Sequence, residues 1–145
     1  MQRFDENTRV KLPATIQFMR LGYEYQSLRD IELDSETRIA VNRFKPAIER
    51  INNIKLTDAE VLSLIDDIKS VIKQNDMGQA FYRWIIDPQD QIKLVDFDNV
   101  YDNDFAVVNE LFYGPQERGS FRPDINVLIN GIPLGFLEVK KPNNE

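Results

Sequence analysis

Two acidic residues and a lysine near the C-terminal end of the sequence have a spacing that suits metal-assisted hydrolysis. Asp124 begins one apolar run, and Glu138 and Lys140 close the next. Residues two apart along a strand share a face, so Glu138 and Lys140 are expected to point the same way. Asp124, Glu138 and a backbone carbonyl such as that of Val139 would offer hard oxygens to Mg²⁺. Lys140 would then orient a nucleophile or stabilise a developing oxyanion during attack on a phosphodiester.

The composition leaves this chemistry open and excludes much else. The chain has 145 residues, with no histidine and no cysteine. The absence of imidazole excludes a Ser-His-Asp triad and a histidine base, and the absence of thiols excludes disulfides, thiolate nucleophiles and zinc ribbons. The groups that remain available for catalysis are carboxylates, lysine, tyrosine and a hard metal ion held by oxygen ligands.

The net charge of −6 argues against a nucleic-acid partner only when it is taken as a whole. Residues 1–86 carry 13 acids and 13 bases, residues 87–104 carry six acids and one base, and residues 117–145 carry four of each. Most of the net negative charge therefore lies in residues 87–104, and a local DNA-binding surface elsewhere is still compatible with the composition.

A second copy of the spacing shows that the bare pattern has little specificity. Residues 67–69 are Asp-Ile-Lys, with Asp58 upstream. Thr57 followed by Glu60 is the pattern of a helix capping box, and apolar residues continue with helical spacing to near Asn75. The acid and the lysine in 67–69 would diverge around this helix, which favours a solvated helix face.

The first half of the chain is predicted to be mainly helical. Apolar residues between Val10 and Leu21 have helical spacing, and Gly22 is a natural helix stop. Pro13 either kinks this helix or begins a second one. The other predictions are a short strand over 23–28, a helix over 35–51 and, over 79–86, either a helix or a strand.

The second half is predicted to be a β-meander, which with the helices gives an α+β (mixed α/β) fold. Asn130–Gly131 is a strong signal for a hairpin turn. The predicted strands are Ile92–Phe97, Phe105–Phe112, Asp124–Ile129 and Ile132–Val139.

The length of the hairpin loop tests whether the three residues can share a site. A plain two-residue turn at Asn130–Gly131 would place Asp124 opposite Leu137, with Glu138 on the other face. An odd loop with Gly131 in the left-handed conformation, or a bulge near Gly135, would return both acids to one face. We therefore predict an odd loop or a bulge. A regular two-residue hairpin would exclude the shared site and leave an edge hairpin with solvated terminal charges.

Three blocks of this region together resemble a known nuclease core. They are RPDI at 122–125, NGIPL at 130–134 and LEVKKP at 137–142. The blocks resemble the PD-(D/E)XK superfamily and, more narrowly, the N-terminal domain of the R (restriction, motor) subunit of type I restriction-modification enzymes. The resemblance extends upstream to LVDF at 94–97, the segment 103–109, and the segments 6–9 and 21–25.

The resemblance implies a restriction-endonuclease-like mixed sheet flanked by helices, and Mg²⁺-dependent cleavage of double-stranded DNA. Asp124 and Glu138 match the metal-binding acids of the family, and Lys140 matches its catalytic lysine. An acid on the first helix often joins such sites, and Glu6 is the best match, with Asp5 as the alternative. Asp96 falls in a matching strand, but a structural or solvated role is favoured.

The resemblance also implies that residues 1–145 are a single nuclease domain from the N-terminus of a larger subunit. The family's Gln-x-x-x-Tyr helix would follow Glu145, and the chain has no phosphate loop of the form GxxxxGK[ST]. ATP binding and translocation would belong to the rest of the subunit, whose partners would be the modification and specificity subunits. Self-association of the fragment is a further expectation. No signal peptide or membrane span is predicted, which indicates a cytoplasmic protein.

Two other interpretations stay open. One is a catalytically silent nuclease-fold domain that serves in DNA binding or assembly. The other is a PD-(D/E)XK nuclease of another lineage, such as a mobile-element protein.

Overall fold

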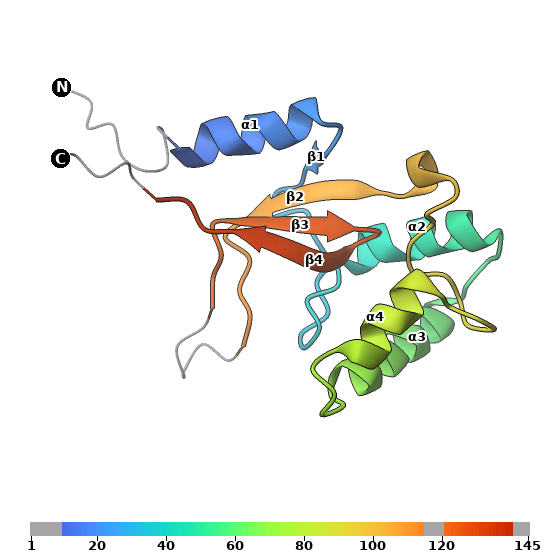
Figure 1. Ribbon diagram of the computed structural model, residues 1–145. Helices are drawn as coiled ribbons and strands as arrows, with labels where there is room; N and C mark the ends of the chain where they lie inside the picture. Colours follow the sequence, from blue (N-terminus) through green and yellow to red (C-terminus); the bar gives the residue numbers. More distant parts are fainter. Residues whose placement is uncertain (1–9, 115–120, 141–145) are drawn as a thin grey trace, which may run out of the picture. The chain divides into compact units, whose positions relative to one another are not determined.

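Four α-helices and a four-stranded mixed sheet make up the part of the chain that the computed structural model describes, residues 10–114 and 121–140 (Figure 1). The predicted α+β fold is confirmed. None of the helices in these residues combines the length and the apolar character needed to cross a membrane. The described residues divide into two compact units: the first comprises residues 10–31, 105–114, 121–128 and 133–140, and the second comprises residues 32–104 and 129–132.

The first unit contains one helix and the sheet, except for Ile129 and Ile132 at its hairpin end. The strands follow one another in the order β1 (Glu24–Tyr25), β2 (Phe105–Asn109), β3 (Ile125–Ile129) and β4 (Ile132–Leu137). β1 runs parallel to β2, and the arrows of β2, β3 and β4 alternate in direction (Figure 1). The helix α1 (Leu12–Arg20) packs its apolar side on the sheet. The core of this unit consists of Val107, Ile125 and Val139, against which Val10, Ala14, Phe18, Tyr23 and Val127 pack.

The boundaries of α1 follow local signals in the sequence. Pro13 lies in the first turn, where its missing N–H needs no partner within the helix. Gly22 follows the C-cap residue Leu21 with φ +98°, a left-handed conformation that favours glycine. The predicted stop at Gly22 is therefore confirmed. The predicted strand over 23–28 is limited to the two residues of β1.

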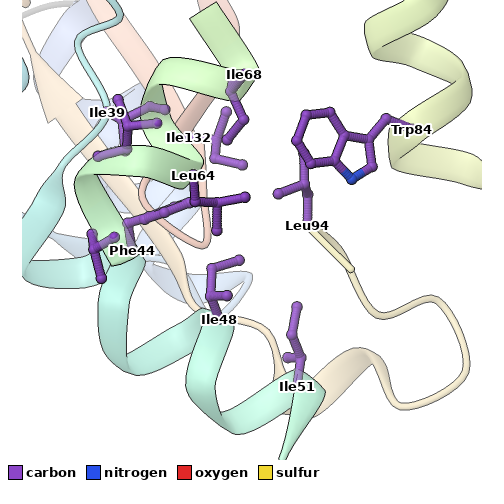
Figure 2. Packing of buried hydrophobic residues seen from close by; sticks show 11 residues of the cluster. Ile39, Phe44, Ile48, Ile51, Leu64, Ile68, Trp84, Leu94 and Ile132 are labelled. Carbon is purple, nitrogen blue, oxygen red and sulfur yellow. The ribbon is translucent and has the colours of Figure 1, made fainter. Parts of the chain in front are cut away.

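The second unit is mainly helical. It contains α2 (Val41–Asn52), α3 (Asp58–Ile72), α4 (Gln79–Ile86) and the 3₁₀ turn η2 (Val100–Asp102). Segment 79–86 is thus a helix. Its Trp84 is 5% exposed and donates from Nε1 to the Ile92 carbonyl at 2.8 Å. Figure 2 shows the core of this unit, in which Trp84 lies with Ile39, Phe44, Ile48, Ile51, Leu64, Ile68, Leu94 and Ile132.

The predicted capping box of α3 is present. Thr57 Oγ1 accepts from the Glu60 N–H at 3.2 Å, and Glu60 Oε2 accepts from the Thr57 N–H at 2.7 Å. The helix ends at Ile72, slightly before the predicted Asn75. Strong N-terminal capping and a continuous apolar stripe therefore fix this helix locally.

The predicted helix over 35–51 starts too early. α2 begins at Val41, and the preceding segment is a turn. Asp34 Oδ2 accepts from the N–H groups of Thr37 at 2.7 Å and Glu36 at 3.2 Å, and Arg38 has φ +61°. The left-handed Arg38 ends this turn, and Ala40 forms an isolated antiparallel bridge with Leu33, so residues 35–40 stay outside the helix.

The predicted strand Ile92–Phe97 is wrong, because this segment has no regular structure. Its peptide groups are instead bonded by asparagine amides. Asn52 accepts from the Lys93 N–H at 2.8 Å and donates to the Lys93 carbonyl at 2.9 Å. Asn103 makes the equivalent pair of bonds with Asp96, at 2.8 and 2.7 Å. These side chains replace the neighbouring strand that an apolar segment would need.

Candidate active site at the base of the hairpin

The turn between β3 and β4 has two residues. Asn130 has φ +51° and Gly131 has φ +77°, as a tight hairpin turn requires. The predicted odd loop is therefore wrong. Asn130 is completely buried: its Nδ2 donates to the Leu94 carbonyl and to Asn103 Oδ1, both at 2.8 Å, and its Oδ1 accepts from the Asp104 N–H at 2.7 Å. Buried amide bonds thus hold the turn.

Side-chain contacts nearer the base of the hairpin show which residues share a face. A Cβ at Gly135 would lie 3.8 Å from Val127 Cβ, closer even than the roughly 4.5–5.5 Å between direct neighbours on one face of adjacent strands. Val139 likewise packs in one cluster with Ile125. Gly135 and Val139 therefore lie on the same face as Val127 and Ile125.

The alternation of side chains then places Asp124 and Glu138 together on the opposite face. A two-residue turn followed by regular pairing would separate them, so these contacts indicate a one-residue bulge in the hairpin, the second of the two arrangements that we predicted. β4 is one residue longer than β3, with six residues against five. A regular hairpin would have excluded a shared site, but it would place Gly135 and Val127 on opposite faces, which their proximity contradicts.

The backbone beyond β4 contacts Asp124 directly. β4 ends at Leu137, and the Val139 N–H donates to Asp124 Oδ2 at 2.9 Å. Asp124 is half-buried, Val139 is 8% exposed, and Glu138 and Lys140 are exposed. Burial alternates over 138–140, so Glu138 and Lys140 lie on the outer side while Val139 joins the core. The structure therefore brings Asp124 next to the Glu-x-Lys segment, while the roles of these residues stay predictions.

A further carboxylate, Glu110, lies beside Asp124 and was missed by the sequence analysis. It follows β2 with φ +60°, and its N–H donates to the Asp124 carbonyl at 3.2 Å. Its Oε1 accepts from Lys11 Nζ at 2.8 Å. The hydrogen bond from Lys11 holds the pKa of Glu110 below its usual value, with a further lowering by Arg122, while burial and the charge of Asp124 act in the opposite direction. One sequence feature could have indicated Glu110: it directly follows β2, and the end of β2 lies next to the start of β3.

The donor set fits Mg²⁺ in its chemistry. Mg²⁺ in proteins is held by one or two carboxylates and keeps several waters. Asp124, Glu138 and the Val139 carbonyl would supply that number of oxygens. Across residues 10–114 and 121–140, no group of three or more acidic side chains is placed to hold a metal ion. Glu6 and its alternative Asp5 lie outside the described residues.

Asp96 has a structural environment. It is 3% exposed, and its Oδ1 accepts from the N–H groups of Asp98 at 3.0 Å and Asn99 at 2.9 Å. The bond from Asn99 is the main cause that lowers the pKa of Asp96. These bonds close a turn at 96–99, which favours the structural role over the solvated one.

Comparison with known proteins identifies the family. The family model described as type I restriction enzyme R protein N terminus matches residues 3–145, so the chain belongs to this family, and the narrower resemblance, to the N-terminal domain of the R subunit, is confirmed. It is 30% identical over 167 residues to a putative type I restriction enzyme MjaIXP endonuclease subunit of Methanocaldococcus jannaschii, covering 98% of this chain and 16% of that protein. It is 27% identical over 150 residues to the type I restriction enzyme HindI endonuclease subunit of Haemophilus influenzae, covering 86% of this chain and 14% of that protein. The chain thus spans a small fraction of the length of these relatives.

Proposed function

We propose that this chain is the Mg²⁺-dependent endonuclease domain of a type I restriction enzyme R subunit and that it hydrolyses phosphodiester bonds of double-stranded DNA. Family membership and the names of both relatives, each an endonuclease subunit, support the proposal. ATP-dependent translocation and the contacts with modification and specificity subunits would belong to the complete enzyme.

The observation that carries the proposal is the arrangement at the base of the hairpin. Asp124 precedes β3 and Glu138 follows β4, and the side-chain contacts along these two strands support a shared face for the two acids, with Lys140 on the same side. The bond from the Val139 N–H to Asp124 Oδ2 fixes the orientation of that carboxylate. Such preorganisation is what a metal-dependent site requires, because misplaced ligands cost both affinity and rate.

Each residue has a distinct role in the proposed reaction. Asp124 and Glu138 would hold Mg²⁺ with the Val139 carbonyl. When bound, Mg²⁺ supplies a water of lowered pKa and neutralises phosphate charge. Lys140 would donate hydrogen bonds that orient the attacking water and offset the negative charge that develops on the phosphate oxygens. The water oxygen bonds to phosphorus as the bond to the leaving oxygen breaks, which yields one phosphate monoester and one hydroxyl end.

Plasmid cleavage by the complete enzyme tests the proposal. The R subunit would be assembled with its modification and specificity subunits, with Mg²⁺ and ATP, and wild type would be compared with Asp124→Ala and Lys140→Ala. We expect each substitution to reduce the cleavage rate by about 100-fold or more, because Asp124→Ala removes a ligand of Mg²⁺ and Lys140→Ala removes a charge that acts on the reacting phosphate. ATP hydrolysis, measured on the same samples, should be unchanged.

The matched controls are Asp58→Ala and Lys69→Ala, which remove the same residue types from the other copy of the pattern. Both should cleave like wild type. Cleavage that persists in Asp124→Ala and Lys140→Ala would refute the assignment.

A further inference from the structure

Next to Asp124, the buried Lys11 forms an ion pair with Glu110. Lys11 is only 8% exposed, yet its ammonium bonds Glu110 Oε1 at 2.8 Å. Burying a lysine is unfavourable unless a partner compensates its charge. Lys11 is the N-cap residue of α1, while Glu110 lies directly after β2.

Glu110 also has a backbone conformation that its residue type disfavours. Its φ of +60° lies in the left-handed region, where glycine or asparagine would be more favourable. Strained backbone at residues next to a reaction centre commonly has a functional origin. Here the strained residue bonds the Asp124 carbonyl through its own N–H at 3.2 Å. A buried lysine and a strained glutamate therefore meet at the backbone of the acid that we assign to the metal.

We propose that the Lys11–Glu110 ion pair sets the affinity of Asp124 for its divalent cation. Glu110 adds a second negative charge beside Asp124, and Lys11 reduces the effect of that charge. This inference rests on the proposed function, because it takes Asp124 as a metal ligand. Glu110 is a positioning residue in this scheme, since it acts on the cation through Asp124 and the local charge.

The proposal predicts effects of opposite sign for the two partners. Glu110→Gln keeps a side chain that can bond Lys11 but removes the negative charge, so the positive charge of Lys11 should weaken cation binding by about three- to tenfold. Lys11→Met keeps an apolar stem and removes the main charge that compensates Glu110, with only the weaker effect of Arg122 left, so it should strengthen binding by a similar factor. An ion pair that only braced the strand ends would weaken binding in both variants.

The experiment measures cation binding without DNA. Mn²⁺ would be titrated into the purified R subunit that contains this chain and followed by water-proton relaxation, at low salt and at about 0.5 M salt, where screening should shrink both shifts. Glu110→Asp, which keeps the charge, should stay close to wild type. The matched controls are Asp58→Asn and Lys45→Met, which change the same charges in an exposed ion pair of the second unit.

In parallel, the Mg²⁺ concentration for half-maximal plasmid cleavage should rise in Glu110→Gln and fall in Lys11→Met.

Asp124→Asn separates failure of this inference from failure of the proposed function. If Asp124→Asn binds Mn²⁺ and cleaves DNA like wild type, the metal site itself is wrongly assigned. If Asp124→Asn loses both, but Glu110→Gln and Lys11→Met shift affinity in the same direction or no more than the controls, only the role of the ion pair is refuted. Should Lys11→Met fail to fold, as judged by its thermal melt, Glu110→Gln against Glu110→Asp still decides the question.

Discussion

Helix α3 and the β3–β4 hairpin carry the same order of acidic and basic residues but use them differently. In α3, Asp58 is paired with Lys45 at 2.7 Å, and Lys69 is paired with Glu36. In the hairpin, none of Asp124, Glu138 and Lys140 forms an ion pair with another described residue. The charges of α3 thus join segments of the second unit, whereas in the hairpin Glu138 and Lys140 are exposed and Asp124 is half-buried.

Periodicity explains the difference. In both copies the middle residue is buried, Ile68 in the helix and Val139 in the hairpin. Around a helix, the residues on either side of a buried position diverge by about 200°, whereas in an extended segment they return to the same side. Residues two apart therefore share a face only in an extended segment. The same residue types can form a joint site there but not in a helix.

The largest expected difference is between Glu138→Gln and Asp67→Asn. Glu138→Gln removes a charged ligand of the proposed metal site, so plasmid cleavage by the complete enzyme should fall by about 100-fold. Both residues are exposed, so the free energy of unfolding should change by less than about 0.5 kcal/mol in either variant. Asp67→Asn should cleave normally. Equal cleavage by the two variants would remove the distinction between the helix and the hairpin.

The next prediction separates the folding role of the hairpin turn from the chemistry at its base. A Cβ at Gly131 would lie 2.6 Å from the Ala40 carbonyl and 2.7 Å from the Phe44 nitrogen, in a left-handed conformation. Gly131→Ala should therefore lower the free energy of unfolding by about 2–4 kcal/mol, measured by urea denaturation. Gly135→Ala meets only Val127 at an ordinary contact distance and should change it by less than about 0.5 kcal/mol. Similar values for both variants would contradict this packing.

The smallest effect concerns the ion pairs of α3 at acid pH. Hydrogen bonds from Lys69 and Lys73 hold the pKa of Glu36 below its usual value of 4.5. A lowered pKa in the folded state means that Glu36 adds stability above its unfolded pKa, and this stability is lost as the pH falls through the folded value. Glu36→Gln should therefore flatten the decline of Tm below about pH 5, by no more than about 3 °C. A decline identical to that of wild type would show that these exposed pairs are fully screened.

Local signals in the sequence predicted those elements whose causes are local. The Thr57–Glu60 capping box, the stop at Gly22 and the Asn130–Gly131 turn each depend on residues within one turn of chain, and all three are present. The predicted strand over 92–97 failed because its bonds come from Asn52, Asn103 and Asn130, which lie up to 41 positions away in sequence. Apolar content alone cannot distinguish such a segment from a strand.

The candidate site followed the same rule. The Asn130–Gly131 turn and the alternation around Val139 made the grouping of Asp124 with Glu138 and Lys140 predictable. The choice between an odd loop and a bulge was not predictable, because it depends on side-chain packing across the hairpin and not on a short sequence motif. Glu110 could not be found in this way, because its proximity to Asp124 arises from strand pairing across 14 residues of chain. Its partner Lys11 is still more distant in sequence, at 99 positions.

Asn130 has a consequence for the chemical lifetime of the protein. An asparagine followed by glycine is the pair most prone to deamidation, because the small glycine leaves its nitrogen free to attack the side-chain carbonyl. In the folded chain, both ends of this amide are buried and bonded. Deamidation in an unfolded molecule would leave an aspartate or isoaspartate there, and a carboxylate only accepts hydrogen bonds, so it could not restore the donations to Leu94 and Asn103. The bonds that hold this amide in the folded chain should therefore slow its deamidation, and loss of the amide should weaken the hairpin turn.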